Sequence, residues 1–155
     1  MKALIATAAA AAALMAAGSV AAQDWRLPAN YGAANLSYGF TPDPYTVNVV
    51  SGGSISASSA ISSSCNGSIS AAPDFELTYS AGSLPLIISV NSNADTTLVV
   101  NAPDARWYCD DDGGNGLNPS LRWNAPMSGT YDIWVGTFGG GNAPATLSIS
   151  ELYSY

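Results

Sequence analysis

Residues 75–100 read FELTYSAGSLPLIISVNSNADTTLVV, and this stretch decides the fold class. Apolar and polar side chains alternate through 75–79 and again through 84–90, on either side of the turn at 81–83. A third apolar run, 97–100, follows a polar turn. Alternation with a period of two is typical of half-buried β-strands. Several short strands separated by turn residues predict an antiparallel β-sandwich.

The rest of the chain carries more segments of this kind. The sequence GSISA at 53–57 returns at 67–71 and predicts two short strands around the serine-rich loop 58–64. Residues 23–44 contain three prolines and are expected to form an extended lead-in, so the sandwich domain is expected to span 45–155. Further strands are expected at 45–50, 106–109, 131–135 and 147–149.

The amino-terminal residues 1–22 have the features of a secretory signal peptide. Met1-Lys2 is a short positive segment, 3–17 is almost entirely apolar, and 18–22 supplies the small residues that signal peptidase requires. Cleavage after Ala22 would make the mature protein secreted or periplasmic. No later segment is long and apolar enough to span a membrane as a helix.

The charge balance restricts the class of partner. The whole chain has a net charge of −7, and Lys2 is its single lysine. Removal of the signal would leave three arginines against eleven acidic residues, a net charge of −8. Such a surface repels nucleic acid and anionic lipid. It suits cations, a polysaccharide or another protein, and exposed strand edges could support self-association.

Cys65 and Cys109 are the two cysteines of the chain. In an oxidising compartment an even pair of cysteines predicts a disulfide. Two buried free thiols are the alternative.

Catalytic chemistry has few residues to draw on. The chain has no histidine, which excludes the Ser-His-Asp and Cys-His arrangements and the usual zinc and copper sites. The mature chain would also lack the lysine that a Schiff base needs. Carboxylates remain, but Glu76 and Glu151, the two glutamates, are expected to be solvated. We therefore expect a protein that is not an enzyme, with a carboxylate-based hydrolase as the less favoured alternative.

Asp110-Asp111-Asp112-Gly113-Gly114 is the sharpest polar feature of the sequence. Three adjacent carboxylates repel one another unless water, arginine or a cation relieves them. Oxygen ligands on a glycine-rich turn suit Ca²⁺, although the spacing is not that of an EF-hand. An acidic solvated turn, paired with Arg106 or Arg122, is the alternative.

Three tryptophans, Trp107, Trp123 and Trp134, fall in or near expected strands. Exposed aromatic rings in a row would stack on sugars, which would make the chain a carbohydrate-binding module. Burial in the core of a small sandwich is the alternative for these side chains.

The segment from Asp95 to Ile149 resembles the bacterial pre-peptidase C-terminal domain. The residues that carry the resemblance are the strand opened by Asp95, the acidic loop from Asp110 to Asn118, and the sequence GTYDIWVG at 129–136. The closing strand at 145–149 completes the match.

The resemblance implies a jelly-roll-like β-sandwich and a role auxiliary to secreted hydrolases, without proteolytic activity of its own. It also implies that Asp95 and Asn118 would be neighbours of calcium in the acidic loop. The expected function is therefore an exported, non-enzymatic module, stabilised by Ca²⁺, for binding at the cell surface or outside the cell.

Overall fold

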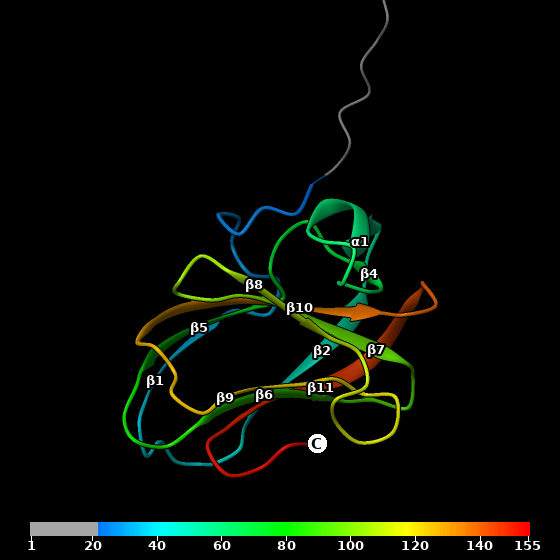
Figure 1. Cartoon of the computed structure of the whole chain (residues 1–155). Helices are drawn as coiled ribbons and strands as arrows, with labels where there is room; N and C mark the ends of the chain where they lie inside the picture. The colour runs from blue at the N-terminus through cyan, green and yellow to red at the C-terminus, as the bar shows by residue number, and fades with distance from the viewer. Residues whose placement is uncertain (1–21) are drawn as a thin grey trace, which may run out of the picture.

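The computed structural model describes residues 22–155, which form a β-sandwich of two sheets (Figure 1). The predicted all-β fold class is confirmed, whereas the predicted signal peptide lies outside the described residues except for Ala22. The elements in chain order are β1 (Ala33–Ser37), β2 (Tyr45–Gly52), β3 (Ile55–Ser56), α1 (Ala57–Ala60), β4 (Ser68–Ile69), β5 (Phe75–Ser80), β6 (Leu86–Asn91), β7 (Thr96–Asn101), β8 (Trp107–Asp110), β9 (Ser120–Trp123), β10 (Gly129–Thr137) and β11 (Asn142–Ser150).

Strand β10 is the centre of the larger, seven-stranded sheet. It pairs on one side with β5, from Gly129 opposite Tyr79 to Ile133 opposite Phe75, and on the other side with β7. β8 extends the sheet beyond β7, and β1 extends it beyond β5. β4 joins the far end of β10 and pairs with β3. These pairings are antiparallel except for the parallel pair β1 and β5.

The smaller sheet has four strands in the order β2-β11-β6-β9. β11 is its long central strand, with β2 along one side and β6 along the other. The two sheets form separate layers, and α1 and β4 lie above the layer that contains β10 (Figure 1).

Alternate residues of each strand face the space between the two sheets. On β10 these are Tyr131, Ile133 and Val135, which are fully buried. The residues between them, Asp132 and Trp134, therefore lie on the outer face of the seven-stranded sheet. Other buried members of the interior are Phe75, Leu77, Tyr79, Leu86, Ile88, Val90, Leu98, Val100, Leu147 and Ile149.

A second, smaller apolar cluster covers one end of that outer face. Residues 55–69, which comprise β3, α1 and β4 and are called the cap below, pack there against Val99 and Trp134. The predicted disulfide between Cys65 and Cys109 is present and fastens the cap to β8. The cap therefore buries apolar side chains that the outer face would otherwise expose to water.

Three local features differ from the sequence-based expectations. Residues 23–44, expected to be an extended lead-in, contribute strand β1 to the larger sheet. The serine-rich loop expected at 58–64 begins inside the short helix α1. β9 was not predicted as a strand, whereas the two GSISA segments do form β3 and β4 and pair with each other.

None of the helical structure in residues 22–155 has the length and apolar character that crossing a membrane requires.

We expect the disulfide to contribute about 4 kcal/mol to the free energy of unfolding, from the loop entropy of a cross-link that spans 44 residues. The double variant Cys65→Ser/Cys109→Ser should unfold at a lower urea concentration than the oxidised protein. Urea titration followed by tryptophan fluorescence checks this, with the reduced wild-type protein as the matched control. Equal midpoints for the oxidised protein and the double variant would contradict it.

Candidate binding groove on the outer face of the larger sheet

The part of the outer face that the cap leaves uncovered is hollowed and carries both aromatic and polar side chains. β10, β5 and β7 place Asp132, Glu76 and Asn101 on this face, and β8 adds Trp107. Trp25, from the segment before β1, lies over the same region, and its side chain is 53 % exposed. The fold therefore brings residues from five segments to one surface.

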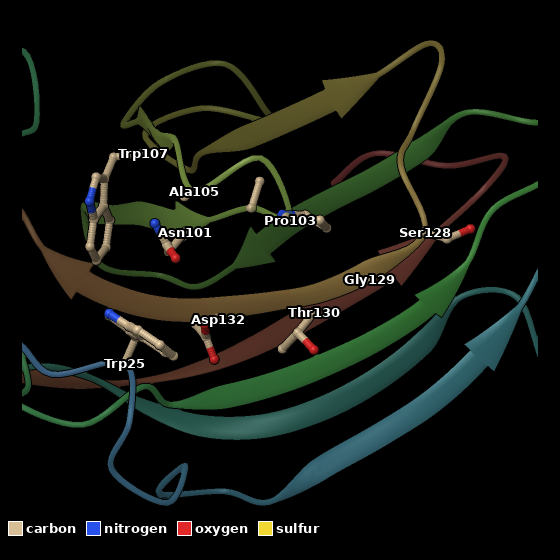
Figure 2. Close-up of a pocket in the computed structure, with 10 residues that line it drawn as sticks. Trp25, Asn101, Pro103, Ala105, Trp107, Ser128, Gly129, Thr130 and Asp132 are labelled. Atoms are coloured by element: carbon tan, nitrogen blue, oxygen red, sulfur yellow. The ribbon is translucent and has the colours of Figure 1, made fainter.

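An open groove with a volume of about 470 Å³ lies there, and Figure 2 shows ten of the residues that line it. Trp25 and Trp107 lie at one end in this view, with Asn101 and Asp132 beside them and Ser128 at the other end. A second hollow of about 490 Å³ adjoins the groove, because Trp25, Thr130 and Asp132 line both. Volumes in this range are typical of small-ligand sites.

Trp107 is held in place from behind. Its ring lies 5.3 Å from the ring of Trp134, which is fully buried beneath the cap. Cys109, two residues along the same strand, is tied to the cap by the disulfide. The ring contact with Trp134 and the disulfide at Cys109 both restrain β8, and they therefore hold the Trp107 ring against the groove.

Trp25 is positioned by backbone hydrogen bonds rather than by a strand. The amide of Asp24 donates to the carbonyl of Ala71 over 2.7 Å, and the amide of Asn30 donates to the carbonyl of Pro73 over 2.8 Å. The Asn30 side chain also donates to Asp74 Oδ1 over 3.1 Å. The segment that carries Trp25 is therefore fastened at both ends to residues 71–74.

Asp74 is the buried centre of this attachment. Its Oδ2 accepts a hydrogen bond of 2.7 Å from the amide of Val135, just beyond the point where β10 stops pairing with β5. Burial raises the pKa of Asp74 to about 6, while the hydrogen bonds from Val135, Asn30 and Ser70 act in the opposite direction. The carboxylate thus satisfies a strand amide that would otherwise be orphaned.

Asp132 differs from Asp74 because it lacks such donors. Only 5 % of the residue is exposed, and none of the described residues donates a hydrogen bond to its side chain. Burial is the main cause that raises the pKa of Asp132 to about 6, and the charge of Glu76, directly opposite on β5, raises it further. The groove therefore contains a buried carboxyl whose charge is not compensated.

The described residues contain three arginines, and each is engaged elsewhere. Arg26 Nε lies 2.9 Å from Asp24 Oδ1, and Arg106 Nε lies 3.8 Å from Asp104 Oδ2. Arg122 Nε donates to the side chain of Asn124 over 2.8 Å. Since residues 22–155 contain neither lysine nor histidine, they hold no other side-chain cation that could pair with Asp132.

The structure separates the three tryptophans proposed for ligand stacking. Trp107 is half-buried and lines the groove, as that role requires. Trp134 is fully buried, so a stacking role for it is wrong; it supports Trp107 instead. Trp123 packs edge-on against Tyr108 and Tyr131 at the interior cluster, with ring centroids 5.3 and 5.4 Å away. Sequence reasoning missed Trp25, because it lies outside the expected strands.

The acidic loop is arranged largely as a structural turn. Asp110 Oδ2 accepts 2.8 Å hydrogen bonds from the amides of Gly113 and Ser120, and a Cβ at Gly113 would lie only 2.5 Å from that oxygen. Asp111 Oδ2 accepts from the side chain of Asn66 over 2.6 Å. The suggested pairing of the loop with Arg106 or Arg122 is not seen among the described residues.

Asp112 is the exposed member of the loop. Desolvation raises its pKa, and the neighbouring charges of Asp111, Asp95 and Asp110 add to this effect. The charge of Asp95 therefore acts on the acidic loop. Across residues 22–155, however, no group of three or more histidine, cysteine, aspartate or glutamate side chains is arranged to hold a metal ion.

Asn118 and Asp95 border the loop on its buried side. The Asn118 side chain accepts a 2.8 Å hydrogen bond from the Thr96 hydroxyl and donates to the carbonyl of Ser92 over 2.9 Å. Asp95 Oδ1 is buried and has no hydrogen-bond partner among the described residues.

Glu151 was expected to be solvated, and this expectation is wrong. The residue is 3 % exposed, and its carboxylate accepts hydrogen bonds from the Tyr79 hydroxyl over 2.6 Å and from the amide of Gly39 over 2.9 Å. Glu151 thus links the end of β11 to the turn after β1. Glu76 is half-buried on the outer face, beside Asp132.

No protein-family model matches this chain, and no curated protein matches it. Among solved structures, this chain is similar to PliG of Aeromonas hydrophila, a periplasmic lysozyme inhibitor of g-type lysozyme. The two sequences are 15 % identical, the match covers 76 % of this chain and 96 % of that chain, and the TM-score is 0.43. It is also similar to the pre-peptidase C-terminal domain of collagenase from Bacillus anthracis. Here the identity is 17 %, the match covers 76 % of this chain and 94 % of that chain, and the TM-score is 0.45. These are distant likenesses, and membership of the pre-peptidase C-terminal family stays a prediction from the sequence.

The buried carboxyl of Asp132 makes stability depend on pH. A carboxyl with a higher pKa in the folded than in the unfolded chain destabilises the fold as pH rises from about 4 to about 6. We expect Asp132→Asn to raise the free energy of unfolding by about 1 kcal/mol at pH 7.5 and to leave it nearly unchanged at pH 4. Urea titrations of both proteins across this range check the expectation. A variant that follows the wild-type pH profile would contradict it.

Proposed function

We propose that this protein is an exported, non-enzymatic β-sandwich module that binds an external ligand in the groove between Trp25 and Trp107. The observation that carries the proposal is the meeting of two tryptophans with the uncompensated carboxyl of Asp132 in one hollow of ligand size. Binding sites characteristically combine apolar or aromatic walls with a few polar groups that orient the ligand.

The arrangement of the carboxyls supports binding rather than glycoside hydrolysis. Asp132 and Glu76 are directly opposite on neighbouring strands and share one face of the sheet. A glycosidase places its two carboxyls on either side of the scissile bond, with the sugar between them. Cross-strand neighbours instead stand side by side on one face of the sheet, so both carboxyls lie on the floor beneath a ligand.

The disulfide supports the exported location. Such cross-links form and persist in oxidising compartments, and the Cys65–Cys109 bond fastens the cap that supports Trp107. Oxidation therefore contributes to the shape of the proposed site as well as to the stability of the fold.

A test of the groove uses three soluble probes: a chitin hexamer, a chitosan hexamer and a pentapeptide with one central arginine. We expect at least one probe to change the tryptophan fluorescence, and Trp25→Ala and Trp107→Ala each to weaken its binding about tenfold, which corresponds to about 1.4 kcal/mol. Trp123→Phe is the matched control, because Trp123 packs at the interior cluster rather than in the groove.

Two outcomes would contradict the proposal. One is that a probe binds with the same affinity to the wild-type protein and to both groove variants. The other is that none of the three probes binds. Circular dichroism of the variants establishes that any loss of binding is not a loss of folding.

Calcium binding by the acidic loop is a second proposal, and two observations support it. The charges of Asp95, Asp110 and Asp111 act together on Asp112, and a cation would relieve this repulsion. Asp95 Oδ1 is also buried without a hydrogen-bond partner among the described residues, so it retains an oxygen lone pair for a ligand. A site with few charged ligands would be weak, in the range of extracellular calcium modules.

For such a site, calcium at about 10 mM should raise the free energy of unfolding by about 1–3 kcal/mol, and EDTA should reverse the gain. Differential scanning calorimetry measures the effect, with NaCl at equal ionic strength as the salt control. Asp112→Asn should abolish the gain, whereas Asp104→Asn, outside the loop, should preserve it. A melting temperature that calcium and EDTA leave unchanged would remove calcium from the function of this protein.

A further inference from the structure

We propose that the groove recognises an organic cation: a lysine or arginine side chain of a polypeptide partner, with Trp25 and Trp107 against its charged end and Asp132 as its counter-ion. The inference rests on the proposed function, since it names the ligand class of the same groove.

The first property is the cost of the Asp132 charge. Only 5 % of the residue is exposed, it lines the groove, and no described residue donates a hydrogen bond to its side chain. A buried carboxylate without donors or a counter-charge is unfavourable. Asp74 and Glu151 accept hydrogen bonds from strand or turn amides, but Asp132 does not.

The second property is that the chain has little means to neutralise this charge itself. Arg26 is the one arginine that lines the adjoining hollow, and Asp24 holds its guanidinium while the Trp25 ring lies 5.8 Å beneath it. Glu76, the nearest neighbour across the strand pair, carries the same sign as Asp132. The negative charge of Asp132 can therefore be fully neutralised only by a proton or by an external cation.

The third property is the kind of cation that the walls favour. Ammonium and guanidinium groups are attracted to the faces of tryptophan rings, and this attraction grows when water is excluded. Calcium and magnesium instead need several oxygen ligands, whereas Asp132 and Glu76 are the two carboxyls that line the groove and the adjoining hollow. A groove with two tryptophans and one buried carboxylate therefore matches an organic cation better than a metal ion.

The fourth property separates a charged ligand from a neutral sugar. A neutral sugar would cover Asp132 and remove its remaining contact with water, yet it would bring no compensating charge. A basic side chain would cover the same surface and neutralise the carboxylate. The strongly acidic chain, with a net charge of −7, would also attract a basic polypeptide from solution.

Competition with protons supplies an independent signature. The charged and titratable groups that face Asp132 are Glu76 from β5 and Arg26 from the segment before β1, whereas β7 contributes the neutral Asn101. Burial and the charge of Glu76 raise the pKa of Asp132 to about 6. Affinity for a cation should therefore fall as the pH is lowered through about 6, because protonation removes the counter-ion.

The experiment compares four probes by tryptophan fluorescence titration at pH 7.5 and about 150 mM salt. Two are pentapeptides with a central arginine or lysine, the third has acetyl-lysine at the same position, and the fourth is glucosamine. We expect the first two peptides to bind and the acetylated peptide to bind at least tenfold more weakly. Glucosamine, which has an ammonium group but no peptide, separates an amino sugar from a polypeptide as the source of the cation.

Variants test the named residues. Asp132→Asn should weaken peptide binding about tenfold and abolish its pH dependence, although this variant is expected to be more stable at pH 7.5. Asp112→Asn removes the same charge from the acidic loop and should leave binding unchanged. Arg26→Gln should bind at least as tightly as the wild-type protein, because it removes the one arginine near the groove.

The outcomes distinguish this inference from the proposed function. Equal binding of the lysine and acetyl-lysine peptides, with loss in Trp107→Ala, would overturn the cation and leave the groove as a binding site. Binding of glucosamine without the peptides would overturn the polypeptide partner. Binding that Asp132→Asn leaves unchanged would overturn the counter-ion. Absence of binding by both basic peptides would overturn the inference, while the chitin hexamer still tests the groove.

Discussion

Strand β10 is packed against the interior along one face and beneath the cap at one end of the other face, and the structure depends on this constraint. Tyr131, Ile133 and Val135 fill the space between the sheets, and Trp134 on the opposite face is fully buried by the cap. Asp132 lies on the outer face beyond the cap, where Glu76 and Asn101 stand opposite it on the adjacent strands and Trp25 lines the same groove. Its low exposure therefore comes from these neighbours and not from the cap.

The scarcity of basic residues determines how the other buried carboxylates are accommodated. In most folds a buried aspartate or glutamate pairs with lysine, arginine or histidine. Here the buried Asp74 and Glu151 and the partly buried Asp110 are satisfied by backbone amides and neutral side chains instead. Each of the three also joins segments that are distant in the chain or closes a turn. These three carboxylates thus act as structural acceptors, whereas the side chains of Asp132 and Asp95 accept no hydrogen bond from the described residues.

Local patterns predicted much of the fold. Alternation in 75–79 and 131–135 identified β5 and β10, and the repeated GSISA segments identified β3 and β4, because these patterns are properties of the strands themselves. The site was harder to predict. Trp25 is held at the groove by hydrogen bonds between its segment and residues 71–74. Trp134 is fully buried and Trp107 only half-buried, and this difference depends on how far the cap extends over the outer face. Such contacts are long-range and leave no periodic signal in the sequence.

The contrast between the acidic loop and the groove shows why the density of charge in a sequence is a poor guide to a binding site. Three consecutive aspartates are conspicuous, yet water solvates the exposed Asp112, while amide groups satisfy Asp110 and Asp111. A single aspartate within an apolar alternation attracts little notice, although its burial makes each uncompensated charge more costly. A ligand gains the most binding free energy where polar groups of the free protein lack hydrogen-bond partners or a counter-charge. The physical case for an external partner is therefore stronger at Asp132, which shares an open groove with Trp25 and Trp107, than at the three aspartates of the acidic loop.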